Sequence, residues 1–327
     1  MRVAVDTSPL VQTRAGTARY VRGLLGELER RKDVEVRRLS FGGPGRTDAF
    51  VRDTVWYPVG LPCAARGADV LHCPTYRAPL VSTVPLVVTV HDLALFRHPG
   101  AFNRWSRLYG RRMIPRVLRA AGRVIAVSEF TRRELVQLFR VPEERLRVIP
   151  NAVDETFVAE GPAADGDYVL AVGTLEPRKN LQRVAAAARR LGVELRVVGA
   201  SGWGRVELDG DGVRWLGRVP DEELARLYRG ARCVAYASVY EGFGIPVLEA
   251  MACGAPVVTS RGGAMEEVAD GAAVLVDPLD SASIAAGIER AAAERELLGR
   301  RGLERARQFT WKAVADATVA VYREGAE

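Results

Sequence analysis

Residues Tyr236 to Ser260 read YASVYEGFGIPVLEAMACGAPVVTS, an order that predicts a strand, a loop, a helix and a second strand. An apolar run of strand length, Cys233 to Ser238, precedes the loop. Pro246 suits the first position of a helix because its missing N–H needs no partner there, and Gly254 and Pro256 predict the end of that helix. Such an alternation is typical of parallel α/β sheets, which bind ligands beyond the carboxyl ends of their strands.

Two glutamates stand eight residues apart in this stretch. Glu241 belongs to the loop, and Glu249 falls in the first turns of the helix, where the positive end of the helix dipole favours a carboxylate. Gly242 and Gly244 let backbone amides approach a ligand closely. Either glutamate alone would more often be a solvated or helix-stabilising carboxylate. Together they predict a site in which Glu241 accepts from sugar hydroxyls and Glu249 from a ribose diol.

The chain has 327 residues, which favours about two domains of about 150 residues each. Strand-like and helix-like runs alternate from end to end, as in parallel sheets with crossover helices. The small, polar segment AEGPAADGD at 159–167 predicts the linker. The strands and helices predicted most clearly are strands at 2–6, 34–39, 69–73, 86–91, 123–128 and 168–172, and helices at 16–31, 129–139 and 310–322.

The charge of +7 is unevenly distributed. Residues 1–160 carry 26 Lys or Arg against 16 Asp or Glu, whereas residues 161–327 carry 21 against 24. We therefore expect the first half to face an anionic partner, although a solvated arginine-rich surface would have the same composition. No zinc-finger, RNP or basic-zipper pattern is present, which argues against a nucleic-acid partner.

No apolar run approaches the ~20 residues that cross a bilayer, and the chain starts directly with a strand-like segment. We expect a cytoplasmic protein without a signal peptide. The four cysteines form no C-x-x-C pair and are expected to be mostly buried thiols.

A basic loop follows the strand at 168–172. It reads Gly173-Thr-Leu-Glu-Pro-Arg-Lys-Asn180 and leads into a helix, so Arg178 and Lys179 fall where a diphosphate would meet helix amides. Lys179 is one of three lysines in the chain, which argues mildly against a generic surface charge.

Two motifs of the first half also follow strands. His91, in Thr89-Val-His91-Asp92, could donate to a sugar hydroxyl or to a developing charge, although a histidine at a strand end is more often structural. Gly16 opens a helix after the first strand, where backbone amides could face a phosphate.

The segment from Phe96 to Arg123 has eight arginines and no acidic residue, interleaved with aromatic residues. Trp105, Leu108 and Tyr109 lie at helical spacing, which is compatible with a helix on a membrane surface or against an anionic acceptor. A core helix with a charged outer face is the favoured explanation of the pattern, and Pro115 predicts an interruption.

Two D-x-D sequences, Asp165-Gly-Asp167 and Asp209-Gly-Asp211, resemble a motif that binds metal diphosphates. Their central glycines are more typical of turns, and we predict no metal site. The chain has no G-x-x-x-x-G-K-[ST] and no G-x-G-x-x-G after the first strand, which disfavours a nucleoside triphosphatase and a dehydrogenase.

The segment Glu241-Gly-Phe-Gly-Ile-Pro-Val-Leu-Glu249-Ala-Met-Ala-Cys-Gly254 resembles the E-x7-E signature of the retaining glycosyltransferases of family 4. That resemblance implies an α/β protein of the GT-B fold, in which two Rossmann-like parallel-sheet domains face a central cleft. It assigns residues 1–162 to an acceptor domain and 163–308 to a nucleotide-sugar donor domain. The last helix, within 309–327, would cross back to the first domain.

The resemblance also implies roles for particular residues. Lys179 and Arg178 would bind the donor diphosphate, and Glu241 and His91 would contact the donor sugar; we take these four as the catalytic candidates. The candidates for donor binding are Gly16, Gly173, Thr174, Gly217, Val219, Gly242, Phe243, Gly244, Ile245 and Glu249.

The motifs T-L-E-P-R-K-N, V-H-D-L and E-G-F-G-I-P resemble those of bacterial mannosyltransferases that act on polysaccharides or glycolipids. We therefore expect a metal-independent, retaining transfer of mannose from GDP-mannose to a cell-surface glycan or lipid-linked acceptor, with other nucleotide-sugars left open. The substrate would be the nucleotide-sugar itself, with no cofactor, and the basic first domain could touch the inner face of the membrane. A sugar-nucleotide epimerase of the same fold and a non-catalytic nucleotide-sugar-binding subunit are the alternatives.

Overall fold

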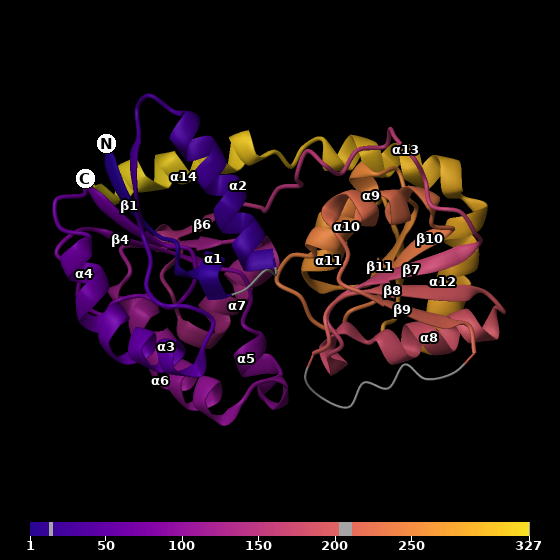
Figure 1. Ribbon diagram of the computed structural model, residues 1–327, viewed down its shortest axis with the longest axis horizontal. Coiled ribbons are helices and arrows are strands. Elements are labelled where there is room, and N and C mark those ends of the chain that lie inside the picture. Colours follow the sequence, from indigo (N-terminus) through magenta and orange to yellow (C-terminus); the bar gives the residue numbers. More distant parts are fainter. Residues whose placement is uncertain (13–15, 203–210, 327) are drawn as a thin grey trace. The chain divides into compact units, whose positions relative to one another are not determined.

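The computed structural model describes residues 1–12, 16–202 and 211–326, and the chain forms two compact units (Figure 1). Unit 1 consists of Met1–Arg97, Phe102–Ala152 and Thr310–Glu327. Unit 2 consists of His98–Ala101 and Val153–Phe309. The domain limits expected above, 1–162, 163–308 and 309–327, stay predictions.

Unit 1 contains a parallel sheet that has six strands within the described residues, in the order β2-β1-β3-β4-β5-β6. Its strands are β1 (Arg2–Asp6), β2 (Glu35–Leu39), β3 (Val70–Cys73), β4 (Leu86–Val90), β5 (Arg123–Ala126) and β6 (Leu146–Val148). Its helices are α1 (Ser8–Gln12), α2 (Gly16–Arg30), α3 (Arg46–Val51), the π-helix η1 (Arg52–Gly60), α4 (Leu61–Ala64), α5 (Ala94–Arg97), α6 (Arg104–Ala120), α7 (Glu129–Phe139), the 3-10 turn η3 (Glu143–Arg145) and α14 (Trp311–Ala326).

Successive strand residues point to opposite faces of this sheet, and both faces are buried. Val3 and Val87 pack in one apolar cluster with α2 and α14, whereas the next residues along the strands, Ala4 and Val88, pack in another with α6. The long apolar runs read as strands in the sequence follow from this two-sided burial.

The C-terminal helix α14 packs against α2 and β4 in unit 1, more than 280 residues from β1 along the chain. In Figure 1 it lies in yellow beside the indigo α2. Trp311 of α14 lies so close to Gly23 of α2 that a β-carbon there would come within 2.2 Å of the indole ring.

Unit 2 contains a second parallel sheet of six strands, again counted over the described residues, in the order β12-β11-β10-β7-β8-β9. Its strands are β7 (Tyr168–Val172), β8 (Glu194–Val198), β9 (Val213–Gly217), β10 (Cys233–Tyr236), β11 (Val257–Ser260) and β12 (Val274–Val276). Its helices are η2 (Pro99–Ala101), η4 (Pro177–Lys179), α8 (Leu181–Arg190), α9 (Asp221–Gly230), α10 (Ile245–Ala252), α11 (Gly263–Ala269), α12 (Ser281–Ala293) and α13 (Arg295–Ala306), of which η2 and η4 are 3-10 turns.

The interruption predicted at Pro115 is wrong. The helix α6 runs from Arg104 to Ala120 with Pro115 inside it, and Asn103 caps its start by accepting from the Ser106 amide at 2.8 Å. Ile114 and Val117, on either side of the proline, are buried against the sheet. This apolar burial offsets the backbone hydrogen bond that a proline removes.

Across residues 1–12, 16–202 and 211–326, no helix combines the length and the apolar character that crossing a bilayer requires. Three of the four cysteines, Cys73, Cys233 and Cys253, are buried thiols as predicted, and Cys63 is exposed.

Candidate active site

The strand order of unit 2 places two predicted motifs side by side. Strands β8 and β9 follow β7 on one side, and β10 to β12 lie on its other side, so the order reverses between β7 and β10. Open α/β sheets bind ligands at such a reversal. The loop after β7 carries Arg178 and Lys179, and the loop after β10 carries Glu241. The two loops are joined directly, because the Val239 amide donates to the Arg178 carbonyl at 2.9 Å.

Both cations contact the same carboxylate. The Lys179 ammonium donates to Oε1 of Glu241 at 2.6 Å, and the Arg178 guanidinium donates to Oε2 at 2.8 Å. All three side chains are nearly buried, with 13% or less of each exposed. The three residues that the sequence placed on two separate loops therefore form one ion-paired cluster.

Electrostatics keeps this cluster charged. Burial acts to lower the pKa of Lys179, but the Glu241 charge, Tyr236 and the hydrogen bond to Glu241 together outweigh it, and the pKa is raised. Burial likewise acts to raise the pKa of Glu241, but Lys179 and Arg178 outweigh it and the pKa is lowered. The cluster consequently holds its charges across the neutral pH range.

Sequence reasoning missed three members of the cluster. Glu176 accepts from Arg178 at 2.8 Å, and the Tyr236 hydroxyl accepts from Lys179 at 2.8 Å. Asn180 adopts a left-handed conformation and donates to the Ala237 carbonyl at 2.8 Å, which fixes the first loop against the end of β10. Glu176 and Asn180 lie inside the basic loop that follows the strand at 168–172. Their place in that loop was the sequence signal that could have identified them. With Glu176 and Glu241, two carboxylates balance two cations.

Glycines let the loops after β7 and β8 approach each other. The aliphatic part of Lys179 lies across Gly173, where an added β-carbon would come within 3.1 Å of it. A β-carbon on Gly199, after β8, would come within 1.9 Å of the Gly173 carbonyl oxygen. Only glycine fits at that position, and sequence reasoning did not single it out.

The loop residues 242–245 lead directly into α10. Gly244 has a φ of 107° and is the N-cap of the helix, a conformation that favours glycine. Pro246 is the second helical residue, one place later than predicted. The Phe243 ring is buried and packs edge-on against Phe309, with 6.0 Å between the ring centroids. The donor contacts of Gly242, Phe243 and Ile245 stay predictions.

Glu249 lies on the second turn of α10 and is 2% exposed. Its Oε2 accepts from the Tyr228 hydroxyl of α9 at 2.9 Å. Tyr228 is a further residue that sequence reasoning missed, since it lies on a helix 21 positions earlier.

The remaining donor candidates of unit 2 lie near the same sheet edge. Gly217 ends β9 with a φ of 68°, and its carbonyl accepts from the Gly199 amide at 2.9 Å. Thr174 follows Gly173 in the loop after β7, and Val219, two residues beyond β9, is half-buried. Their donor contacts stay predictions.

His91 belongs to unit 1, directly after β4. Its Nε2 is 3.0 Å from the Pro74 carbonyl, and its ring meets the Tyr20 ring edge-on at 4.8 Å. Burial lowers the pKa of His91 below its usual value of 6.5. Because a carbonyl only accepts, Nε2 carries the proton of the neutral ring and Nδ1 is its acceptor. Gly16 is the first residue of the 15-residue helix α2.

Of the two D-x-D sequences, Asp165 to Asp167 lies in a loop before β7, in agreement with a turn. Asp209 and Gly210 of the other lie outside the described residues. In the described part of the chain, no three His, Cys, Asp or Glu side chains gather as a metal site would require.

Comparisons with known proteins agree with this geometry. A family model described as glycosyl transferases group 1 matches residues 153–308, and one described as glycosyltransferase family 4 matches residues 14–157. The chain is 30% identical over 348 residues to the O-antigen chain mannosyltransferase B of Escherichia coli, covering 98% of this chain and 88% of that protein.

Solved structures show the same fold. A sucrose-phosphate synthase from Thermosynechococcus elongatus superimposes with a TM-score of 0.81 at 23% identity, covering 99% of this chain and 98% of the other. Anabaena HepE in complex with UDP-glucose superimposes with a TM-score of 0.78 at 20% identity, covering 99% and 100%. These are GT-B glycosyltransferase neighbours, and both units of the present chain carry the corresponding parallel sheets. The chain therefore belongs to the group 1 glycosyltransferases of family 4.

Proposed function

We propose that this glycosyltransferase moves mannose, with retention of configuration, from GDP-mannose to a cell-surface glycan or lipid-linked acceptor. The observation that carries the proposal is the buried cluster of Lys179, Arg178 and Glu241 at the strand-order reversal of unit 2. The mannosyl assignment is supported by the name of the Escherichia coli relative, an O-antigen chain mannosyltransferase.

The cluster suits a sugar diphosphate because its two cations can exchange a carboxylate partner for a phosphate. Without donor, both cations are neutralised by Glu241 and Glu176. A diphosphate brings further negative charge, which Lys179 and Arg178 would bind in place of Glu241. Glu241 would then accept from the hydroxyls of the donor sugar, and Glu249 from the ribose. Donor binding and sugar positioning would thus be coupled through one carboxylate.

The chemical step requires stabilisation of the charge that develops on the departing diphosphate. Lys179 and Arg178, together with amides of residues 242–245, would supply it from a site that is already ordered. These charges need no metal ion, and we propose a metal-independent transfer. Retention would follow from attack on the face that the leaving phosphate occupies, with that phosphate accepting the proton of the acceptor hydroxyl.

His91 would contact the donor sugar as a neutral imidazole. Its Nε2–H is committed to the Pro74 carbonyl, so Nδ1 would accept a hydrogen bond from a sugar hydroxyl. This refines the expectation from sequence, in which the ring donated to the sugar.

The exposed surface of unit 1 supports our proposal for the acceptor and the cellular location. Its helix α6 exposes Trp105 and Leu108 among arginines. The ring centroid of Phe50 of α3 lies 5.7 Å from that of Trp105. We propose that this surface touches anionic lipid at the cytoplasmic face of the membrane, where a lipid-linked acceptor would be presented.

The proposal is tested by assaying the purified protein with GDP-, UDP-, ADP- and dTDP-sugars, first by thermal shift and then by transfer to lipid-linked acceptors. We expect GDP to raise the melting temperature most and GDP-mannose to be consumed only when an acceptor is present. Conversion of the donor alone into another nucleotide-sugar would indicate an epimerase, and binding without turnover a non-catalytic subunit. Either result would refute the proposal.

A further inference from the structure

A chain of buried polar side chains connects the C-terminal helix to His91 within unit 1. The Tyr322 hydroxyl of α14 is 2.7 Å from Nδ1 of His72, and Nε2 of His72 is 2.9 Å from the Thr89 hydroxyl. The Thr89 hydroxyl is 3.2 Å from that of Tyr20, whose ring meets His91 edge-on. The four side chains of this chain, Tyr322, His72, Thr89 and Tyr20, are fully buried, so water cannot replace any of these bonds.

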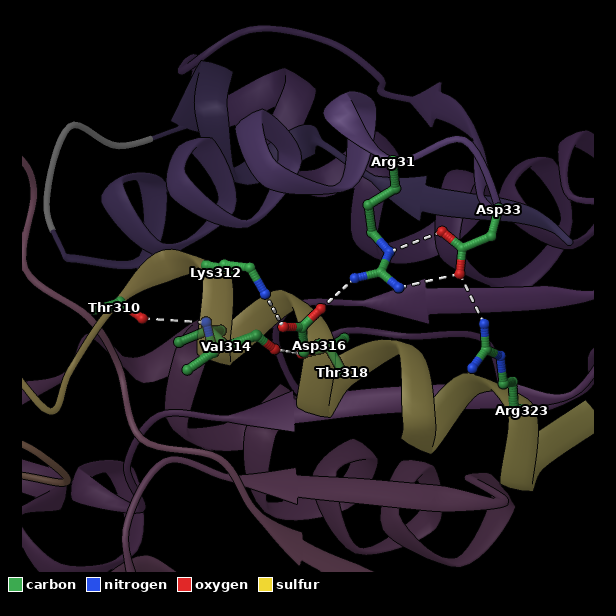
Figure 2. Close-up of polar contacts among 9 residues, drawn as sticks. Arg31, Asp33, Thr310, Lys312, Val314, Asp316, Thr318 and Arg323 are labelled. Atoms are coloured by element: carbon green, nitrogen blue, oxygen red, sulfur yellow. Dashed lines mark hydrogen bonds and ion pairs between the residues drawn. The ribbon is translucent and has the colours of Figure 1, made fainter.

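The far end of the chain returns to α14. Thr318, one turn before Tyr322 on the same helix, neighbours the Tyr20 hydroxyl. Burial raises the pKa of Tyr20 to about 12, although Thr318 acts to lower it. Figure 2 shows Thr318 contacting the carbonyl of Val314, to which its hydroxyl donates at 2.7 Å. The hydrogen-bonded side chains therefore run from α14 through β3 and β4 to α2.

Burial lowers the pKa of His72 to about 3, which keeps the ring neutral. A neutral imidazole donates from one nitrogen and accepts at the other. His72 therefore donates to one of its two hydroxyl partners, Tyr322 and Thr89, and accepts from the other.

We propose that Tyr322, His72, Thr89 and Tyr20 are positioning residues that hold the His91 imidazole in the one orientation in which its Nε2–H reaches the Pro74 carbonyl. The Tyr20 ring is fixed at its hydroxyl by Thr89 and meets His91 edge-on. The catalytic importance of this arrangement rests on the function proposed above for His91. Docking of α14 is then a requirement for activity as well as for folding.

Surface ion pairs also hold α14 in place, but they are not part of the hydrogen-bonded series of buried side chains. Figure 2 shows Asp33 between Arg31 and Arg323, and Asp316 between Arg31 and Lys312. These pairs are solvent-accessible and lie outside the buried chain.

The test uses pairs of variants that differ by one hydroxyl. Tyr322→Phe and Thr89→Val remove a hydroxyl and keep the shape, and Thr89→Ser keeps the hydroxyl. Val319→Ala is the control for stability, because Val319 is buried on α14 and has no polar group. The protein has three histidines, so the imidazole ¹H–¹⁵N signals of the full-length protein can be assigned by single substitutions.

In the wild type we expect His72 and His91 to be neutral, with the His91 proton on Nε2. Tyr322→Phe and Thr89→Val should give a second tautomer or exchange broadening at His91. They should lower kcat on the order of tenfold, less than the ~100-fold that a 1 Å misplacement can produce, with the donor KM little changed. Thr89→Ser should restore both readouts, and Val319→Ala should alter neither.

Wild-type His91 spectra and kcat in Tyr322→Phe and Thr89→Val would overturn the proposal. So would an equal loss of kcat in Val319→Ala, since that would trace the effect to stability alone. The spectra also separate this proposal from the function on which it rests. If the wild type transferred no sugar, the proposed function would fail, whereas an unchanged His91 signal in Tyr322→Phe would refute the positioning alone.

Discussion

At the scale of single residues, the candidate site depends on a carboxylate shared by two cations. Removing either cation leaves Glu241 buried beside the other one, so the fold can survive while the diphosphate loses a partner. Lys179 is the more informative residue to substitute, because it also donates to Tyr236 and its aliphatic part lies across Gly173.

Lys179→Ala should reduce kcat about 10²- to 10³-fold, the range seen when one preorganised donor to a developing charge is removed. Lys312→Ala is the matched control, because Lys312 is exposed on α14 and pairs only with Asp316 among the described residues. Initial rates with saturating donor and acceptor measure the effect. Equal activity of the two variants would remove Lys179 from the transfer step.

Asp6, at the end of β1, should make stability depend on pH. Burial raises the pKa of this carboxyl from 3.8 to about 6, although Ser8 donates to it twice. The folded state therefore holds a proton that the unfolded chain releases, so this contribution is favourable at low pH and is lost as pH rises through about 6. The shift corresponds to about 3 kcal/mol.

The variant Asp6→Asn cannot lose that proton. Relative to Asp6→Asn, the wild type should become less stable by about this amount between pH 4 and pH 7. Urea unfolding of both proteins across this range measures the difference. Parallel pH profiles would show that Asp6 does not titrate as described.

At the scale of elements, the close packing of α2 against α14 depends on Gly23, and Gly26 on the same helix serves as its comparison. A β-carbon at Gly23 would overlap the Trp311 ring, whereas one at Gly26 would meet no atom within 4 Å. The two positions are three residues apart in α2 and have the same helical backbone. Their substitutions therefore separate close packing from helix propensity.

Gly23→Ala should destabilise unit 1 by about 1–3 kcal/mol through overpacking. Gly26→Ala should stabilise it by about 0.5–1 kcal/mol, because alanine loses less conformational entropy in a helix. Thermal or urea unfolding of the two variants provides the measurement. A stabilising Gly23→Ala would mean that Trp311 does not occupy this position.

At the scale of the whole molecule, the charge difference between the two halves of the sequence predicts which part meets an anionic surface. Unit 1 presents α6, on which the exposed Arg104, Leu108 and Arg111 share one face. Each basic residue near an anionic membrane contributes about 1 kcal/mol of binding.

Reversing both charges, Arg104→Glu with Arg111→Glu, should weaken co-sedimentation with anionic vesicles by roughly thirtyfold or more. The same change at the exposed Arg300 and Arg301 of α13, in unit 2, is the control and should have a smaller effect. Neutral vesicles should bind the wild type weakly. If both charge-reversal variants bound anionic vesicles as well as the wild type, a membrane role for α6 would be refuted.

The reaction as a whole should proceed without a divalent cation, because Lys179 and Arg178 supply the charge that a metal ion would. Transfer rates should stay within twofold of the untreated enzyme after incubation with EDTA. Activity that is lost to the chelator and regained with Mg²⁺ or Mn²⁺ would contradict this prediction.

Much of the fold was available from local sequence because it follows from short-range patterns. The strands at 2–6 and 168–172 and the helix at 129–139 begin and end where predicted. Ser128 caps the last of these by accepting from the Thr131 amide at 3.0 Å. The error at Pro115 has the opposite origin, since the burial that sustains α6 comes from a sheet distant in sequence.

The sequence by itself determined the alternation of strands and helices, the E-x7-E motif and the basic loop, because apolar periodicity and turn residues act over a few positions. Only the tertiary structure decided that Lys179 and Arg178 bind the same carboxylate 62 and 63 residues away, and that Tyr322 bonds His72 across 250 residues. Such pairings depend on strand order and helix docking. These are set by the burial of apolar surface over the whole unit, and no local pattern encodes which side chains that burial brings into contact.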